Sequence, residues 1–173
     1  RVDHSPSTFL RRPISIHYVD VAHNELWLLV ATIGDGTRQM GRLQPGDEVN
    51  CLLPLGNGFS MPQKASNRVL LVGGGVGIAP LLYQGEALRK AGHNPVFLLG
   101  GRTASDLLEL DLYKEVGEVY VTTEDGSLGE KGFVTNHSVL EGGRFVVIQT
   151  CGPKPMMLSG ARYAYEHAVE CEA

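Results

Sequence analysis

The stretch that decides the fold of this 173-residue chain is Arg68-Val69-Leu70-Leu71-Val72-Gly73-Gly74-Gly75-Val76-Gly77-Ile78-Ala79-Pro80. It begins as a run of branched apolar side chains, which is typical of a buried strand in a parallel sheet. The run passes into a cluster of glycines and then into a segment of helical period, with Pro80 suited to the first turn. A strand, a glycine loop and a helix in this order predict a phosphate-binding turn, because the loop backbone can approach a phosphate and the helix start offers free N–H groups.

The glycine spacing departs from the common dinucleotide fingerprint G-x-G-x-x-G. Counted from Gly73 the last position is Ile78, and counted from Gly75 it is Pro80. No acidic residue ends the second strand, where Gly100-Gly101-Arg102 stands instead. An ordinary Rossmann dehydrogenase is therefore disfavoured. A tight turn that binds no ligand stays open as the alternative to nucleotide binding.

Outward from this stretch, the two parts of the chain have different patterns. Downstream, apolar runs at 95–100, 119–122 and 144–149 alternate with segments of helical period, which predicts an α/β domain with a parallel sheet. The expected helices cover 79–91, 105–114, 132–139 and 154–170. Upstream, short apolar stretches at 14–19, 26–33 and 49–53 alternate with the turn clusters Asp35-Gly36 and Pro45-Gly46, which predicts a small antiparallel β-barrel.

The boundary between the two patterns falls in the polar connector Met61–Asn67. We therefore predict a partial barrel domain over residues 1–65 and an α/β nucleotide-binding domain over residues 66–173. The first part is short and begins in a polar stretch without Met, so we expect early strands of the barrel to be missing.

Composition excludes several classes of protein. A hydrophobic content of 43% supports a core, and a net charge of -4 without a block of like charge disfavours a nucleic acid partner. No apolar run approaches the ~20 residues that cross a bilayer, and no signal peptide is visible, which predicts no membrane segment and a cytoplasmic location. The three cysteines are widely separated and the six histidines lack paired metal-ligand spacing, so we expect no metal ligands and assign no histidine a role.

Two upstream segments could contact phosphate. In Arg12-Pro13-Ile14-Ser15, the guanidinium could supply a fork for a phosphate, the proline fixes φ and the serine offers a hydroxyl to a ring edge. Solvated surface arginines are the alternative. Further on, the expected strand Leu29–Ala31 leads to Gly34-Asp35-Gly36-Thr37, which is either a second phosphate contact or a plain Asp-Gly hairpin.

Two downstream positions also bear on ligand binding. Cys151-Gly152-Pro153 follows an apolar run, so the thiol should lie at the carboxyl edge of the sheet, where it could line a nicotinamide pocket or be an inert small hydrophobe. Arg102 could hold a 2′-phosphate, although a helix cap at Ser105-Asp106 explains the same segment.

Taken in order and spacing, these motifs resemble the ferredoxin-NADP reductase superfamily, and within it the electron transfer subunits of type 1B dihydroorotate dehydrogenases. The likeness covers essentially the whole chain. The stretches that carry the second likeness are Phe9–His17, Leu53–Phe59 and Glu124–Gly132.

The resemblance implies two bound cofactors. FAD would be held by Arg12, Pro13, Ile14, Ser15, Leu29, Val30, Ala31, Gly36 and Thr37. NAD(H) would be held by Gly74, Gly75, Gly77, Arg102, Cys151, Gly152, Pro153 and Met156, and the resemblance implies NADH, although the residues leave NADPH open. Ser15, near the flavin N5, and Cys151, beside the nicotinamide, would be the catalytic residues.

The resemblance also implies a partner. An FMN-containing catalytic subunit would oxidise dihydroorotate in pyrimidine biosynthesis, and electrons would reach NAD+ through a [2Fe-2S] cluster and this FAD. The family carries that cluster on four cysteines in a C-terminal extension whose motif this chain lacks, and Cys171 precedes the position where those ligands begin. Two alternatives stay open: a stand-alone flavin or ferredoxin NAD(P)H reductase, and a non-catalytic nucleotide-binding sensor.

Overall fold

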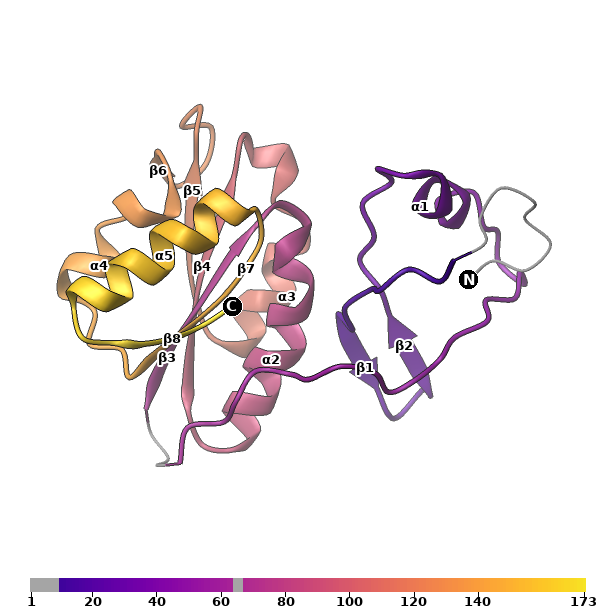
Figure 1. Cartoon of the computed structure of the whole chain (residues 1–173), viewed down its shortest axis with the longest axis horizontal. Coiled ribbons are helices and arrows are strands. Elements are labelled where there is room, and N and C mark those ends of the chain that lie inside the picture. Colours follow the sequence, from indigo (N-terminus) through magenta and orange to yellow (C-terminus); the bar gives the residue numbers. More distant parts are fainter. Residues whose placement is uncertain (1–9, 64–66) are drawn as a thin grey trace.

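The computed structural model describes residues 10–63 and 67–173, which form two units joined by an extended segment (Figure 1). The larger unit is built on a six-stranded sheet with the order β6-β5-β4-β3-β7-β8. Every pair of neighbouring strands in it is parallel. The strands are β3 (Arg68–Gly74), β4 (Asn94–Gly101), β5 (Glu118–Thr123), β6 (Glu130–Lys131), β7 (Val147–Cys151) and β8 (Glu170–Glu172). The predicted α/β domain with a parallel sheet is confirmed.

Helices cover both faces of this sheet (Figure 1). They are α2 (Ala79–Lys90), α3 (Leu110–Val116), α4 (Val139–Gly142) and α5 (Lys154–Glu166), with 3-10 turns η1 (Gly75–Ile78), η2 (Ala104–Asp106) and η3 (Val134–Asn136). Side chains of β3 alternate between the faces: Val69 and Leu71 pack with the residues of α2 and α3, whereas Leu70 and Val72 pack with those of α4 and α5. Burial on both faces explains why this strand reads as a continuous apolar run.

The centre of the sheet is a topological switch point. From β3 the chain crosses to β4 on one side, and β7 later pairs on the other. In the register, Gly73 lies between Leu99 of β4 and Cys151 of β7. The loops that leave β3 and β7 lead to α2 and α5, which pack on opposite faces of the sheet, and open α/β sheets form ligand crevices at such a carboxyl edge.

The helix predictions are confirmed in number but corrected at their ends. The expected helix at 105–114 is wrong in its start, because Glu109 has a left-handed φ of 56° and α3 begins after it. The expected helix at 132–139 is η3 followed by the short α4. The last helix ends at Glu166, and after Ala168, at φ 55°, the chain turns back to form β8 beside β7. The expected continuation of this helix to residue 170 is therefore wrong.

The smaller unit contains an antiparallel two-stranded sheet of β1 (Tyr18–Asp20) and β2 (Glu25–Trp27), followed by α1 (Asp35–Met40). This agrees with a partial antiparallel domain. The described residues 29–31 are extended but are not in a strand, and the Asp-Gly hairpin is wrong because α1 begins at Asp35. Thr37 explains the helix start: its hydroxyl accepts a hydrogen bond from the Gly34 N–H and donates one to the Gly34 carbonyl, each at 3.0 Å.

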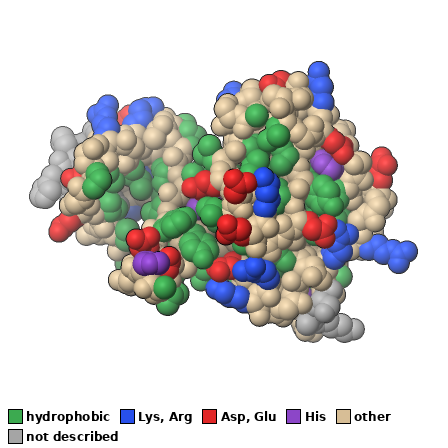
Figure 2. Space-filling model, turned by 180° about the vertical axis from the view of Figure 1, so that it is seen from behind, with side chains coloured by type: hydrophobic (Ala, Val, Ile, Leu, Met, Phe, Trp, Pro, Cys, Tyr) green, Lys and Arg blue, Asp and Glu red, His purple; other side chains and the backbone are tan. Residues whose placement is uncertain are grey.

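The expected boundary between residues 65 and 66 lies outside the described residues and stays a prediction, as do the two domain ranges. Within the described part of the chain, no helix is long and apolar enough to cross a membrane. Lys and Arg side chains are scattered over the face seen from behind rather than gathered in one stripe (Figure 2).

Candidate functional site

A cavity of about 530 Å³ lies at the carboxyl edge of the parallel sheet. Its walls come from the loops after β3, β4, β5 and β7 and from the start of α5. Five of the residues expected to bind NAD(H) line it: Gly74, Gly75, Arg102, Pro153 and Met156. The walls also include Gly100, Gly101, Asp106, Glu124, Gly132, Phe133, Val134, Thr135, Pro155 and Ser159. The structure thus brings both expected nucleotide-binding loops to one cavity.

Close packing explains why glycines occupy the loop after β3. A Cβ atom at Gly77 would lie 2.4 Å from the carbonyl oxygen of Cys151 and 2.4 Å from the Cα of Gly152. A Cβ at Gly74 would lie 2.6 Å from the sulfur of Met156. Gly75 differs, because it has open space around it and a φ of 55°. The glycines therefore let the loops after β3 and β7 touch at the switch point.

Cys151 stands at the end of β7, next to Gly73 in the register. Burial raises the pKa of its thiol, so at neutral pH the side chain is a neutral, weakly polar group rather than a thiolate. Gly152 follows with a φ of 155°, a conformation that favours glycine. The arrangement provides a small uncharged surface beside the glycine loop.

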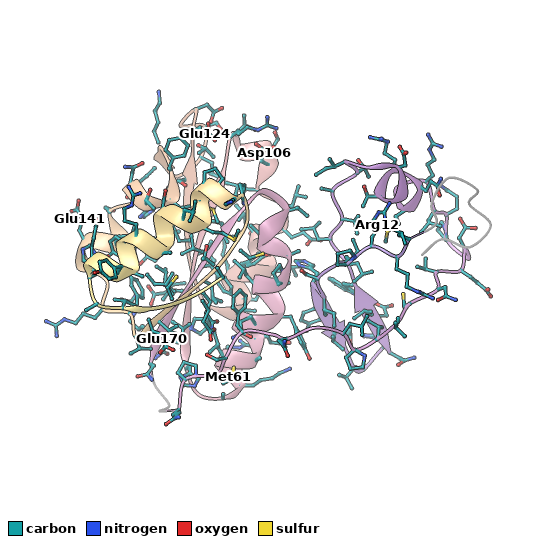
Figure 3. All side chains as sticks on the ribbon, in the orientation of Figure 1. Arg12, Met61, Asp106, Glu124, Glu141 and Glu170 are labelled. Atoms are coloured by element: carbon teal, nitrogen blue, oxygen red, sulfur yellow. The ribbon has the colours of Figure 1, made fainter. Side chains whose placement is uncertain are left out.

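Two acidic residues, Asp106 and Glu124, also line the larger cavity, and sequence reasoning did not single them out. Asp106 and Glu124 lie at the same end of the larger unit (Figure 3). The Asp106 carboxylate accepts hydrogen bonds from the N–H groups of Arg102 at 3.0 Å and Thr103 at 3.1 Å. It also lies 3.7 Å from the Arg102 guanidinium. Arg102 and the expected helix cap at Ser105-Asp106 therefore lie in the same turn. The sequence signal for the cap could have identified Asp106 as a neighbour of Arg102.

A second cavity of about 340 Å³ lies between the two units. Leu29, Val30 and Ala31, expected to contact FAD, form its wall on the smaller unit. Gly75, Arg102 and Asp106 line both this cavity and the larger one. A ligand between the units would therefore lie next to a nucleotide on the glycine loop.

Arg12 lies on the smaller unit, against the start of α1 (Figure 3). A Cβ at the buried Gly36 would lie 3.1 Å from its Nε, so the glycine makes room for the guanidinium. Arg12 donates a hydrogen bond to the Leu10 carbonyl at 3.2 Å and is otherwise exposed. An exposed guanidinium such as this is a group suited to a phosphate.

The remaining expected FAD contacts are less closely grouped. Pro13, Ile14 and Ser15 are in the extended segment between Arg12 and β1 and line neither of the two cavities. Ser15 is exposed. The hydroxyl of Thr37 is engaged in its own helix cap.

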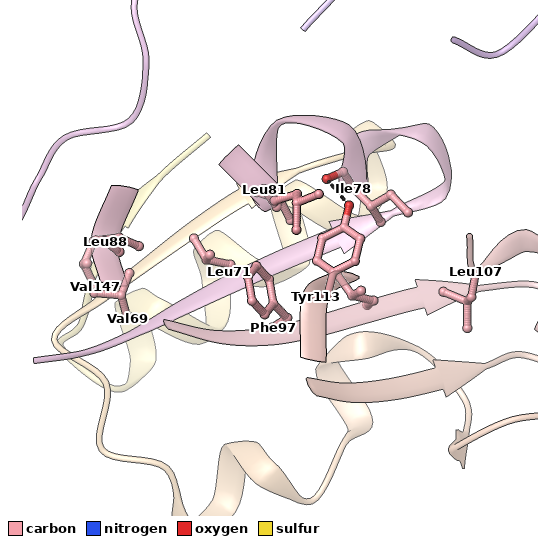
Figure 4. Packing of buried hydrophobic residues seen from close by; sticks show 11 residues of the cluster. Val69, Leu71, Ile78, Leu81, Leu88, Phe97, Leu107, Tyr113 and Val147 are labelled. Carbon is pink, nitrogen blue, oxygen red and sulfur yellow. Dashed lines mark hydrogen bonds between the residues drawn. The ribbon is translucent and has the colours of Figure 1, made fainter. Parts of the chain in front are cut away.

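His17 joins the two units and was given no role by the sequence. It is 2% exposed, its Nδ1 lies 2.8 Å from the carbonyl oxygen of Ala79, and its Nε2 lies 2.7 Å from a carboxylate oxygen of Glu109. Next to it, with ring centroids 6.3 Å apart, the buried Tyr113 donates a hydrogen bond to the Ile78 carbonyl at 2.9 Å (Figure 4). The end of the glycine loop is thus held by two side chains.

A second contact between the units surrounds the buried amide of Gln149. Its nitrogen donates to the carbonyl of Ser60 at 2.8 Å and to Glu172 at 3.0 Å, and its oxygen accepts from Gln84 at 2.9 Å. Burial alone would raise the pKa of Glu172, but hydrogen bonds from Ser60 and Gln149 outweigh it, so the pKa is lowered. The segment that leaves the smaller unit is therefore fixed to β7 and β8.

The described residues fit FAD and NAD(H) but not an iron-sulfur cluster. In the glycine loop, Gly75 has open space around it and lines the larger cavity, where the backbone could meet a phosphate, and Arg12 supplies an exposed cation on the smaller unit. Within residues 10–63 and 67–173, no group of three or more His, Cys, Asp or Glu could hold a metal ion. Cys51 is exposed on the smaller unit, whereas Cys151 and Cys171 lie on neighbouring strands of the sheet. No step can therefore be assigned to a cluster on this part of the chain.

Comparisons with curated proteins give a consistent result. The chain is 38% identical over 170 residues to the dihydroorotate dehydrogenase B (NAD(+)) electron transfer subunit of Shouchella clausii, covering 97% of the chain and 66% of the relative. It is 37% identical over 168 residues to the subunit of the same name from Bacillus velezensis, covering 96% and 65%. The chain belongs to the family of these electron transfer subunits. It spans less than two thirds of their length. No protein-family model matches it.

Solved structures agree with this family assignment. The chain matches the NADH-dependent reduced ferredoxin-NADP oxidoreductase structure with a TM-score of 0.79 and 33% identity, covering 93% of the chain and 59% of that protein. An Amycolatopsis cytochrome P450 reductase matches with a TM-score of 0.77 and 23% identity, covering 96% and 57%. The second likeness supports the fold alone, which is the two-unit fold predicted from the sequence.

Proposed function

We propose that this chain is the FAD- and NAD(H)-binding part of an electron transfer subunit of NAD+-dependent dihydroorotate dehydrogenase, acting in the cytoplasm in pyrimidine biosynthesis. In this function it passes electrons from an FMN-containing catalytic subunit to NAD+. The observation that carries the proposal is the 38% identity to such a subunit over 97% of the chain. The two adjoining cavities, which share Gly75 and Arg102, support it because they can bring a flavin and a nicotinamide together.

The smaller unit holds the flavin in this proposal. Arg12 neutralises a phosphate of FAD, and the N–H groups at Gly36 and Thr37 contact the same group. Residues 29–31 contact the ring system, and Ser15 donates a hydrogen bond near its reactive edge. When bound, FAD exchanges a hydride with a nicotinamide and passes on single electrons, and the protein orients and tunes it.

The larger unit holds the pyridine nucleotide. Gly74, Gly75 and Gly77 let the backbone approach the phosphates, while Pro153 and Met156 form the facing wall. The uncharged thiol of Cys151, together with Gly152, keeps the nicotinamide ring in place. The proposed nucleotide is NADH, because the carboxylates of Asp106 and Glu124 line the cavity and the Arg102 guanidinium lies 3.7 Å from that of Asp106, which offsets its attraction for a 2′-phosphate.

The first experiment compares two neighbouring arginines. The full-length protein is produced with riboflavin in excess, and flavin retention is read from its yellow absorbance. We expect Arg12→Ala to lose flavin, because a phosphate loses its cation. Arg11→Ala is the matched control, since the Arg11 guanidinium instead binds Asn50 at 2.9 and 2.5 Å. An Arg12→Ala protein that stays as yellow as wild type contradicts the assignment.

The second experiment tests the nicotinamide side. We expect Cys151→Ala to slow reduction of the bound flavin by NADH in anaerobic stopped-flow mixing, because the ring loses a contact that aligns it. Val146→Ala, an exposed change on the segment before β7, controls for mutation near this strand. An unchanged rate in Cys151→Ala removes the thiol from the mechanism.

One alternative has its own support. A stand-alone NAD(P)H-dependent flavin or ferredoxin reductase is favoured by the 33% identity to the ferredoxin-NADP oxidoreductase structure. Co-purification decides between them: the proposed subunit brings with it a dihydroorotate-oxidising FMN protein, whereas the reductase comes alone and reduces a small acceptor. A colourless protein that still binds NADH would instead indicate a nucleotide-binding sensor.

A further inference from the structure

His17 is a buried polar link between the proposed flavin-binding segment and the proposed nucleotide-binding loop. It follows Ser15 by two residues and immediately precedes β1. Its Nδ1 contacts Ala79, the first residue of α2, which comes directly after the glycine loop. Its Nε2 contacts Glu109, which comes directly before α3. One side chain therefore meets three structural elements from two units.

The chemistry of these contacts makes them specific. Both ring nitrogens face oxygen atoms, and the carbonyl oxygen of Ala79 can only accept a hydrogen bond. Nδ1 is therefore the donor to Ala79, while Nε2 lies 2.7 Å from a carboxylate oxygen of Glu109. The bond to Ala79 is buried, and the contact with Glu109 is half-buried, since the Glu109 side chain is 42% exposed. The two contacts of His17 therefore fix the orientation of the smaller unit relative to the larger one, in addition to burying surface between them.

The other polar contacts between the units do not replace it. Tyr18 reaches Glu86 at 3.5 Å, the limit for a hydrogen bond, and the Gln149 cluster lies near β8, away from the glycine loop. On the larger unit, the Tyr113 hydroxyl holds the Ile78 carbonyl by a hydrogen bond of its own, although the ring centroids of Tyr113 and His17 are 6.3 Å apart. Losing the histidine should therefore release residues 12–16 while the glycine loop keeps its place.

We propose that His17 is a positioning residue that fixes residues 12–16 relative to the glycine loop and so determines how closely the flavin and the nicotinamide meet. The inference rests on the proposed function, because that function supplies the flavin and the nicotinamide. The contact of His17 with the larger unit rests only on its distances to Ala79 and Glu109.

The test uses a matched pair of histidines. His17→Phe keeps a ring but loses both hydrogen bonds, whereas His17→Asn keeps a donor near the position of Nδ1. His23→Gln is the control: His23 also lies 2.7 Å from a carboxylate, that of Asp20, but its side chain is 73% exposed on the turn between β1 and β2. All variants are made in the full-length protein.

In the FAD-loaded protein, NADH is mixed anaerobically and flavin reduction is followed. We expect His17→Phe to reduce the rate about 10- to 100-fold, the scale of a ~1 Å misplacement, with unchanged NADH affinity and a weaker long-wavelength charge-transfer band. His17→Asn should recover part of the rate, and His23→Gln should match wild type. If His17→Phe loses flavin reduction rate and NADH affinity to the same extent, the site is generally disrupted and the proposal is overturned. An unchanged rate of flavin reduction in His17→Phe also overturns it.

In the protein without FAD, amide hydrogen exchange over residues 12–20 should rise in His17→Phe, with residues 75–83 unchanged. Exchange in His23→Gln should resemble wild type. Unchanged exchange in His17→Phe refutes the link itself. Failure of wild type to bind FAD would refute the proposed function, and the exchange measurement would still decide whether His17 joins the units.

Discussion

Gly77→Ala gives the sharpest test of how the two nucleotide-binding loops are held together. The new Cβ would lie 2.4 Å from both the Cys151 carbonyl oxygen and the Gly152 Cα. These are backbone atoms, so no side chain can turn aside. Because ordinary carbon contacts lie at about 3.5–4.0 Å, the loops after β3 and β7 must separate by roughly 1 Å.

This separation should cost stability and affinity together. Overpacking of this kind costs about 1–3 kcal/mol. At ~2 kcal/mol, a chain of this size should melt about 4–8 °C lower. We also expect NADH affinity to fall about tenfold or more, since each ~1.4 kcal/mol of lost contact is a factor of ten. Thermal unfolding by circular dichroism and NADH titration by fluorescence measure the two effects.

Two other glycines separate the clash from general effects of a methyl group. Gly75→Ala meets no atom within 4 Å but must hold a φ of 55°, so it should cost about 1–2 kcal/mol without moving the loop after β7. Gly142→Ala, at the end of α4, has open space and no positive φ and should be nearly neutral. If Gly77→Ala melts and binds like Gly142→Ala, the reasoning from close contact is refuted.

Three further predictions follow from buried polar groups. Gln149→Leu should lower the free energy of unfolding by about 1–3 kcal/mol in urea titrations, because it leaves several partners unpaired, and a neutral effect would contradict the cluster. A thiol reagent at neutral pH should label exposed Cys51 before Cys151, whose pKa is raised by burial, and labelling of Cys151 should speed up as the pH rises; mass spectrometry shows the order. Burial, and secondarily the charge of Glu109, raise the pKa of Tyr113, so its contribution to stability is complete below about pH 10 and is lost as the pH rises further. Tyr113→Phe should therefore lose less stability than wild type above that pH, and parallel pH curves would count against this.

The α/β half could be predicted because its signals are local. The four main strands are continuous apolar runs, since helices cover both faces of the sheet. The loop after β3 needs glycines for a contact with Cys151 and Gly152, so the same residues identify both the turn and the site. Parallel order then brings the loops after β3 and β7 to one edge, as predicted.

The smaller unit was harder to predict, because its sequence signals have two interpretations. Asp35-Gly36 is typical of a hairpin, yet Thr37 can close a helix cap with Gly34, and the helix is formed. Leu29–Ala31 has the composition of a strand but is extended and unpaired in the described structure, where it forms a cavity wall. Composition alone does not distinguish a paired strand from an extended segment that lines a ligand site.

The contacts that hold the units together had no sequence signal, for a physical reason. His17 and Glu109 are 92 residues apart, and neither lies in a motif whose spacing implies the other. In the sequence, a histidine such as His17 cannot be distinguished from any other polar residue. Its role becomes visible only when the fold places oxygen atoms next to both ring nitrogens. A sequence motif identifies a ligand site when neighbouring residues of one loop form it, as in the glycine loop. The distance between two ligands depends instead on tertiary contacts between their binding units. In the described structure these contacts combine apolar packing of Tyr18, Leu29 and Phe59 with a few polar side chains, and among the polar ones His17 reaches the end of the glycine loop.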